Sequence, residues 1–148
     1  MYRKILVPLD GSSLSESILD QTRDMIKDCD ISELVLLTVV EPFHEQPYRT
    51  RDDWNIKIQK EAVRIAGNYL TALQEKLLAE GIKVESVVLI GDPAKEILEY
   101  TLKKGIDLIM MNAKGRTVND RWVFGSVTNK VIRHSQVPVF VVPVGTRS

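Results

Sequence analysis

The sequence predicts an α/β protein built on a parallel β-sheet. Short apolar runs alternate along the chain with longer stretches in which apolar residues recur every three or four positions. Uninterrupted apolar runs are typical of strands buried on both faces, and the longer spacing is typical of amphipathic helices. Because each run is followed by a helical stretch, successive strands are expected to lie parallel in one sheet.

Composition and length narrow the functional classes. The 148 residues suit one domain, and 20 basic residues balance 20 acidic ones, so we expect no nucleic-acid partner. No apolar run reaches about 18 residues, so no membrane partner is expected. Cys29 is the only cysteine, which excludes an internal disulfide. The chain enters its first strand without a signal-peptide pattern, and we expect a cytoplasmic location.

The first half of the chain predicts two strands and two helices. Residues 2–9 carry the first strand, and the spacing of Ser13 and Glu16 indicates a capping box at the start of the first helix. Residues 34–40 form the second strand, and a polar loop follows. Residues 54–79 form the second helix, which Gly81 ends. Its predicted buried stripe comprises Ile58, Ala62, Ile65, Tyr69, Leu73 and Leu77.

The second half repeats the alternation. Residues 84–90 form the third strand, and Asp92 and Pro93 are the N-cap and first residue of the third helix, which Gly105 closes. Residues 106–111 form the fourth strand, and residues 137–143 form the fifth. Between them, a fourth helix opens on Gly125-Ser126, and its predicted apolar face comprises Val127, Val131 and Ile132.

The Gly125-Ser126 pair is a candidate anion site. The first amides of a helix have no intrahelical acceptors, and the aligned peptide dipoles favour negative charge there. Gly125 would let a ligand approach the backbone, and Ser126 would bind a phosphate oxygen. An ordinary N-cap explains the same residue types, and the pair alone does not separate the two interpretations.

Three stretches match one family of proteins. They are Ile5 to Ser12, then Gly91-Asp92-Pro93, and then Gly115 to Val127 with Val137-Pro138-Val139 after it. Together with the order of elements, they resemble the universal stress protein family over nearly the whole chain. The resemblance implies a five-stranded parallel sheet in the order 3-2-1-4-5, with residues 1–144 as the family domain and residues 145–148 as a loose tail.

The resemblance also implies a ligand, which is ATP or another adenine nucleotide, with Mg or Mn as an accompanying ion. ATP-binding members carry Gly, two residues, Gly, nine residues, and Gly with Ser or Thr. Gly115, Gly125 and Ser126 match this pattern, whereas Asn112 replaces the first glycine. Asn adopts left-handed backbone more readily than other non-glycine residues, which would limit the cost of this replacement.

The resemblance assigns roles within this site. Pro8 and Asp10 would lie beside the nucleoside, with Asp10 near the ribose or a nucleotide-bound metal ion. Val39 would meet adenine through its backbone. We further infer that Lys114, Arg116 and Arg121 add positive charge. The implied nucleotide-binding residues are Pro8, Leu9, Asp10, Ser12, Val39, Asn112, Gly115, Arg116, Gly125, Ser126 and Val127.

Several functions remain compatible with these residues. The first is a nucleotide-binding stress or signalling protein that uses ATP as a regulatory ligand; no residue stands out as a general base, so we expect at most a slow ATPase. The alternative is an interaction protein of the same fold that has lost nucleotide binding, which Asn112 favours. A phosphoacceptor receiver domain would need an acidic cluster after the first strand, and an adenylyl transferase a His-rich motif near the first helix; both are missing.

The last strand predicts a homodimer. Residues 139–142 are apolar and uncharged, and in the implied strand order they lie at an edge of the sheet, where an unprotected strand invites pairing with another chain. We expect this partner to be a second copy of the chain, although another protein partner is compatible with the same edge. The predicted dimer residues are Val139, Phe140, Val141 and Val142.

Overall fold

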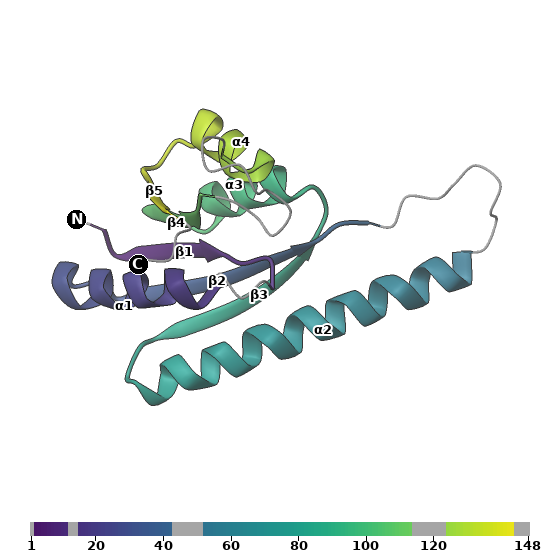
Figure 1. The fold of residues 1–148 in the computed structure, drawn as a ribbon, viewed down its shortest axis with the longest axis horizontal. Helices are drawn as coiled ribbons and strands as arrows, with labels where there is room; N and C mark the ends of the chain where they lie inside the picture. The colour runs from purple at the N-terminus through teal and green to yellow at the C-terminus, as the bar shows by residue number, and fades with distance from the viewer. Residues whose placement is uncertain (1, 12–14, 43–51, 114–123, 144–148) are drawn as a thin grey trace.

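The computed structural model describes residues 2–11, 15–42, 52–113 and 124–143, and its elements follow the predicted alternation (Figure 1). The tail at 145–148 lies outside the described residues. The strands are β1 (Lys4–Pro8), β2 (Glu33–Val40), β3 (Val84–Ile90), β4 (Leu108–Asn112) and β5 (Val139–Val142). The helices are α1 (Ser15–Cys29), α2 (Asp52–Ala79), α3 (Pro93–Lys103) and α4 (Ser126–His134).

The five strands form one parallel sheet in the order β3-β2-β1-β4-β5, which confirms the predicted fold class and strand order. Helices α1 and α2 cover one face of the sheet, and α3 and α4 cover the other (Figure 1). From β1 the chain adds β2 and then β3 on one side of the sheet. It then crosses back and adds β4 and β5 on the other side of β1. The fold therefore contains a topological switch point between β1 and β4.

Burial of the central strands explains their apolar composition. Ile5 and Val7 of β1 pack into the cluster under α1 and α2, while Leu6 between them packs into the cluster under α3 and α4. Each of the three has 0% of its surface exposed. Because successive side chains of a strand point to opposite faces, a strand covered on both faces needs apolar residues at every position.

Local sequence signals set the ends of α3 as predicted. The Asp92 side chain accepts a hydrogen bond of 3.1 Å from the Lys95 amide, and Pro93 is the first residue of the helix. Gly105, just beyond the helix, has a φ of 64°, a left-handed conformation that glycine adopts without steric cost. These signals bring the chain from β3 into α3 and from α3 toward β4.

Two predicted core positions are wrong. Ile65 is 56% exposed and Ile132 is 37% exposed, whereas Ala66 and Leu70 are buried in place of the predicted Ile65. Spacings of three and four residues allow neighbouring stripes on a helix, and packing against the sheet selects one of them. At about 42 Å, α2 is also much longer than β3 at about 23 Å, so its first turns extend beyond the sheet (Figure 1).

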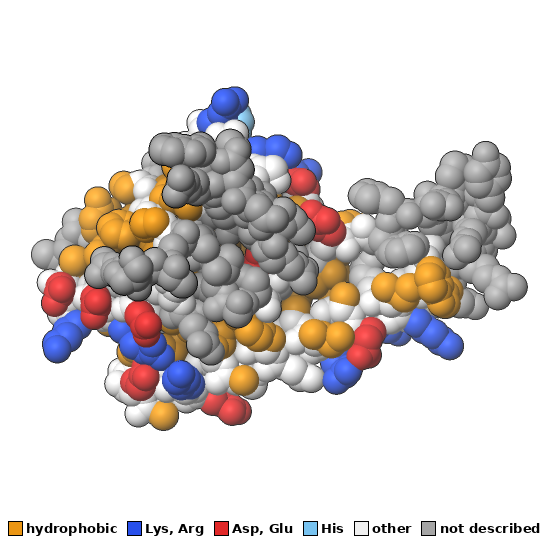
Figure 2. Space-filling view, in the orientation of Figure 1, with side chains coloured by type: hydrophobic (Ala, Val, Ile, Leu, Met, Phe, Trp, Pro, Cys, Tyr) orange, Lys and Arg blue, Asp and Glu red, His pale blue; other side chains and the backbone are white. Residues whose placement is uncertain are grey.

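The β5 strand forms an edge of the sheet and carries an exposed aromatic side chain. It pairs with β4 alone in the described sheet, and Phe140 is 41% exposed. Hydrophobic side chains gather on the side of the molecule where β5 lies, and others cover the first turns of α2 (Figure 2). The edge at β5 is thus both unpaired and apolar, as the dimer prediction requires.

We expect the protein to be a dimer through β5 at micromolar concentration. Pro138 and Pro143 bracket the strand and would limit pairing to a short antiparallel ladder around a two-fold axis. Phe140→Lys should shift the protein toward monomer, because it places a charge within the ladder. Sedimentation velocity measures the outcome, with Leu78→Lys as the control, since Leu78 is 49% exposed on the distant helix α2. A monomeric wild type would contradict the prediction.

Candidate functional site

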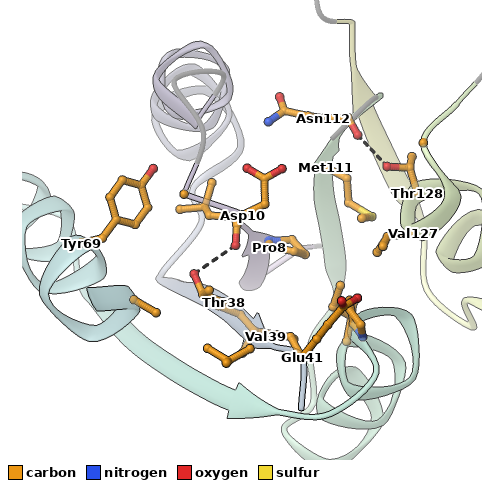
Figure 3. Close-up of a pocket in the computed structure, with 18 of the residues that line it drawn as sticks. Pro8, Asp10, Thr38, Val39, Glu41, Tyr69, Met111, Asn112, Val127 and Thr128 are labelled. Carbon is orange, nitrogen blue, oxygen red and sulfur yellow. Dashed lines mark hydrogen bonds between the residues drawn. The ribbon is translucent and has the colours of Figure 1, made fainter. Parts of the chain in front are cut away.

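A pocket of about 820 Å³ lies at the carboxyl ends of β1, β2 and β4 (Figure 3). This is the switch point of the sheet, where open α/β folds bind their ligands. The predicted nucleotide-binding residues that line it are Pro8, Leu9, Asp10, Val39, Asn112, Gly125, Ser126 and Val127. Ser12, Gly115 and Arg116 lie outside the described residues. The fold thus brings together residues from four separate stretches, and their role in binding stays a prediction.

The β2 side of the pocket exposes backbone polar groups. The last bond from β1 to β2 is the Leu9 amide to the Leu37 carbonyl, at 2.8 Å, while β2 continues to Val40. The Val40 carbonyl faces β3, where it accepts the Gly91 amide at 3.0 Å. Since backbone groups alternate in direction along a strand, the N–H and C=O of Val39 face the side that β1 has left. They form a donor and acceptor pair at the edge of the pocket.

The Thr38 hydroxyl binds the backbone just beyond the end of β1. It donates a hydrogen bond of 3.0 Å to the Leu9 carbonyl, and Thr38 is 8% exposed. This bond satisfies a carbonyl that would otherwise face the pocket without a partner. The chain can then turn at Asp10, whose carboxylate points into the pocket beside Pro8 (Figure 3).

Three hydrogen bonds hold the start of α4 against the ends of β4 and β5. The Gly125 amide donates to the Ala113 carbonyl at 2.9 Å, and the Ala113 amide donates to the Val142 carbonyl at 2.9 Å. The Thr128 hydroxyl donates to the Asn112 carbonyl at 2.8 Å, and its side chain is buried (Figure 3). The first turn of α4 is therefore fixed at the edge of the pocket.

The first amides of α4 have no side-chain cap. The N-cap position is occupied by Gly125, which has no side chain with which to cap the helix. The interpretation of Ser126 as an ordinary N-cap is therefore wrong. Ser126 is instead the first helical residue, and its side chain is exposed. The amides of Ser126, Val127 and Thr128 have no acceptor within the helix, since the carbonyls four residues earlier lie outside it. Ser126 and Val127 line the pocket, so donors and the positive end of the helix dipole face it.

Asn112 does not have the backbone conformation that the sequence suggested. It is the last residue of β4 and pairs with Val142 of β5. Among the described non-glycine residues, only Asp30 has a positive φ, of 54°. Asn112 therefore does not use the left-handed backbone that Asn tolerates, because pairing with β5 keeps it extended. Only its side chain distinguishes Asn112 from glycine in the pocket, which Asp10 also lines (Figure 3).

The described lining of the pocket carries two negative charges. Asp10 and Glu41 are its charged side chains, and no Lys, Arg or His belongs to the part of the lining that the structure describes. The predicted cations Lys114, Arg116 and Arg121 lie outside the described residues. No group of three potential metal ligands occurs among the described side chains. Asp10 therefore suits an ion that arrives with its own ligands, as a nucleotide-bound Mg²⁺ or Mn²⁺ does.

Sequence reasoning missed several residues of the site. Thr38 and Thr128 support it through hydrogen bonds. Thr38 is a polar residue among apolar ones near the end of β2, which was an available signal, whereas Thr128 lies among polar residues in the first turn of α4 and gives no such signal. On α2, the pocket is lined by Ala62, Ile65 and Tyr69, which the sequence predicts as core residues, and by Ala66, which lies outside the predicted stripe.

The fold and pocket define an α/β protein with a pocket at the switch point of its sheet, and comparison with known proteins gives its family. The model of the universal stress protein family matches residues 1–143. The chain belongs to this family, as its motifs suggested. It is 33% identical over 144 residues to universal stress protein MJ0531 of Methanocaldococcus jannaschii, covering 96% of this chain and 82% of that protein.

A second protein of the same organism is similar in both sequence and structure. Universal stress protein MJ0577 is 28% identical over 158 residues, covering 96% of this chain and 95% of that protein. Its solved structure has a TM-score of 0.85 to this one, with 99% of each chain covered. More distant structures with the same fold include a universal stress protein in complex with cAMP, at a TM-score of 0.62 and 21% identity, covering 97% of this chain and 98% of that one. An Arabidopsis thaliana family protein with AMP bound has a TM-score of 0.68 and 16% identity, covering 97% and 93%.

The bond from Thr128 to Asn112 should be a main support of the site. Thr128→Val keeps the shape of the side chain but leaves the Asn112 carbonyl without this donor, which should cost about 1–3 kcal/mol of unfolding free energy. Urea denaturation measures the loss. Thr101→Val is the control, because Thr101 is equally buried and its hydroxyl donates to the Ile97 carbonyl within its own helix. Equal losses in the two variants would contradict a special role for Thr128.

Proposed function

We propose that this protein binds ATP, or a related adenine nucleotide, as a regulatory ligand in stress response or signalling. The observation that carries the proposal is the uncapped first turn of α4, whose amides open into the switch-point pocket. A helix N-terminus of this kind attracts a phosphate group. Phosphates would lie at Ser126 and Val127, the ribose near Asp10, and the base at the end of β2.

The shape of the pocket accommodates such a ligand. Its volume of about 820 Å³ is within the range of small-molecule and cofactor sites. The backbone donor and acceptor of Val39 match the ring nitrogen and exocyclic amine of adenine. Apolar side chains of α2 and α3, including Ala66 and Ile97, supply surfaces against which a base can be buried. The residues present therefore suit a nucleotide at each of its three parts.

Backbone donors give enough binding energy in principle. Hydrogen bonds to a charged group contribute roughly 1.5–3 kcal/mol each. Two or three bonds from the first turn of α4, together with burial of the base, would support micromolar affinity after the entropy of association is deducted. The charges of Asp10 and Glu41 oppose a free triphosphate, and we expect Mg²⁺ or Mn²⁺ to offset them.

The family relationship supports the proposal. Two structures with the same fold hold AMP and cAMP, which share the adenosine group with ATP. A fold alone does not specify an activity, so the assignment depends on the local geometry described above. We propose a cytoplasmic setting, where a lone exposed thiol such as that of Cys29 stays reduced.

Replacement of Ser126 gives a direct test of the amide contacts. Ser126→Pro removes one donor, and proline is favoured at the first position of a helix. Gly125, with φ of −58° and ψ of 155°, has the extended conformation that a residue before proline needs. Ser126→Pro should weaken ATP binding about tenfold with little change in melting temperature, whereas Ser126→Ala, which keeps the amide, should lose less. Calorimetry with ATP and Mg²⁺ measures both, and equal binding by all three proteins would contradict the phosphate contact.

The Asn112 position gives a second test. Asn112→Ala and Asn112→Gly should bind ATP equally well, because an extended backbone gives glycine no advantage. A required left-handed conformation would instead favour glycine by roughly 1 kcal/mol, which is about fivefold in affinity. Calorimetry on the two variants decides between these outcomes.

Wild-type protein that fails to bind at millimolar ATP would replace the proposal with the alternative. The chain would then be an interaction protein with the family fold and without its ligand. Restored binding in Asn112→Gly would identify Asn112 as the cause of the loss.

A further inference from the structure

Glu41 lies where the base of a nucleotide would sit. It directly follows β2 and lines the pocket, two residues beyond Val39. The Val39 side chain packs into the cluster under α3 and α4, and Glu41 is the first residue beyond the end of β2. Figure 3 shows Glu41 across the pocket from Asp10 and Asn112.

The Glu41 carboxylate has no partner among the described residues. None of the ion pairs of the described chain includes it, and it is not among the residues with further interactions. Its side chain is exposed, so no fold-stabilising contact accounts for a carboxylate at this place. An ionised carboxylate is an acceptor only, with room for several hydrogen bonds. It therefore favours a ligand that presents N–H donors at this end of the pocket.

We propose that Glu41 determines base specificity, and that its carboxylate accepts a hydrogen bond from the exocyclic amine of adenine. This assignment rests on the proposed nucleotide-binding function. The 6-amino group of adenine carries two N–H donors, one for the Val39 carbonyl and one for Glu41. Hypoxanthine has a carbonyl oxygen at the same position, which both acceptors repel. The pair thus selects an amino group and rejects an oxygen, with Glu41 adding to the discrimination that the backbone provides.

The closing experiment compares ATP with inosine triphosphate, which carries hypoxanthine. Calorimetry with Mg²⁺ gives the affinity of each nucleotide for the wild type and for Glu41→Gln. The wild type should prefer ATP. Glu41→Gln should reduce the ratio of the two affinities about fivefold, the typical effect of one hydrogen bond, because glutamine can also donate to the hypoxanthine oxygen.

A matched variant separates this role from simple charge. Glu75→Gln removes the same charge from an exposed position on α2 outside the pocket lining and should leave the ratio unchanged. If Glu41→Gln strengthens both nucleotides equally, Glu41 acts only by charge repulsion and the assignment is overturned. An unchanged ratio overturns it as well. Failure of the wild type to bind either nucleotide at millimolar concentration overturns the proposed function itself, and the assignment with it.

Discussion

The site depends on one constraint of the sheet, which is the loss of strand pairing at the switch point. The pairing of β1 with β2 ends at Pro8 and Leu37, and its pairing with β4 ends at Leu6 and Ile109. Beyond these residues the neighbouring strands continue without β1 between them. Backbone groups there bond to side chains, to water or to a ligand, because unpaired polar groups are costly to bury.

Two threonines satisfy part of this requirement. Thr38 supplies the donor for the Leu9 carbonyl, and Thr128 supplies the donor for the Asn112 carbonyl. Both threonines are buried, one in β2 and one in α4, on the two sides of the place where β1 ends. The two threonines do not bond to the N–H and C=O of Val39 or to the first amides of α4. These backbone groups are therefore available to a ligand in the pocket.

The hydrogen bond between Thr128 and Asn112 does not involve the side chain of Asn112. Asn112 contributes its carbonyl to the Thr128 bond, and any residue type supplies a carbonyl. The amides that face the pocket belong to α4, whose first turn is anchored through Ala113 and Gly125. Replacement of a motif glycine by Asn therefore leaves the position of these donors intact.

By itself, the sequence determined the class of fold, the parallel sheet, and part of the pocket lining, including the residues at the ends of β1 and β4 and at the start of α4. These follow from local properties, namely apolar periodicity, the Asp92-Pro93 cap and the glycines that end helices, together with the family resemblance. Only the tertiary structure decided which side of α2 is buried, with Ala66 in place of Ile65, because neighbouring stripes satisfy the same spacing. It also decided the extended backbone of Asn112, the hydrogen bond from Thr128 to the Asn112 carbonyl, and the position of Glu41 in the lining of the pocket. Each depends on a contact or a shared pocket between elements far apart in the chain, and helical or strand periodicity carries no information about such contacts.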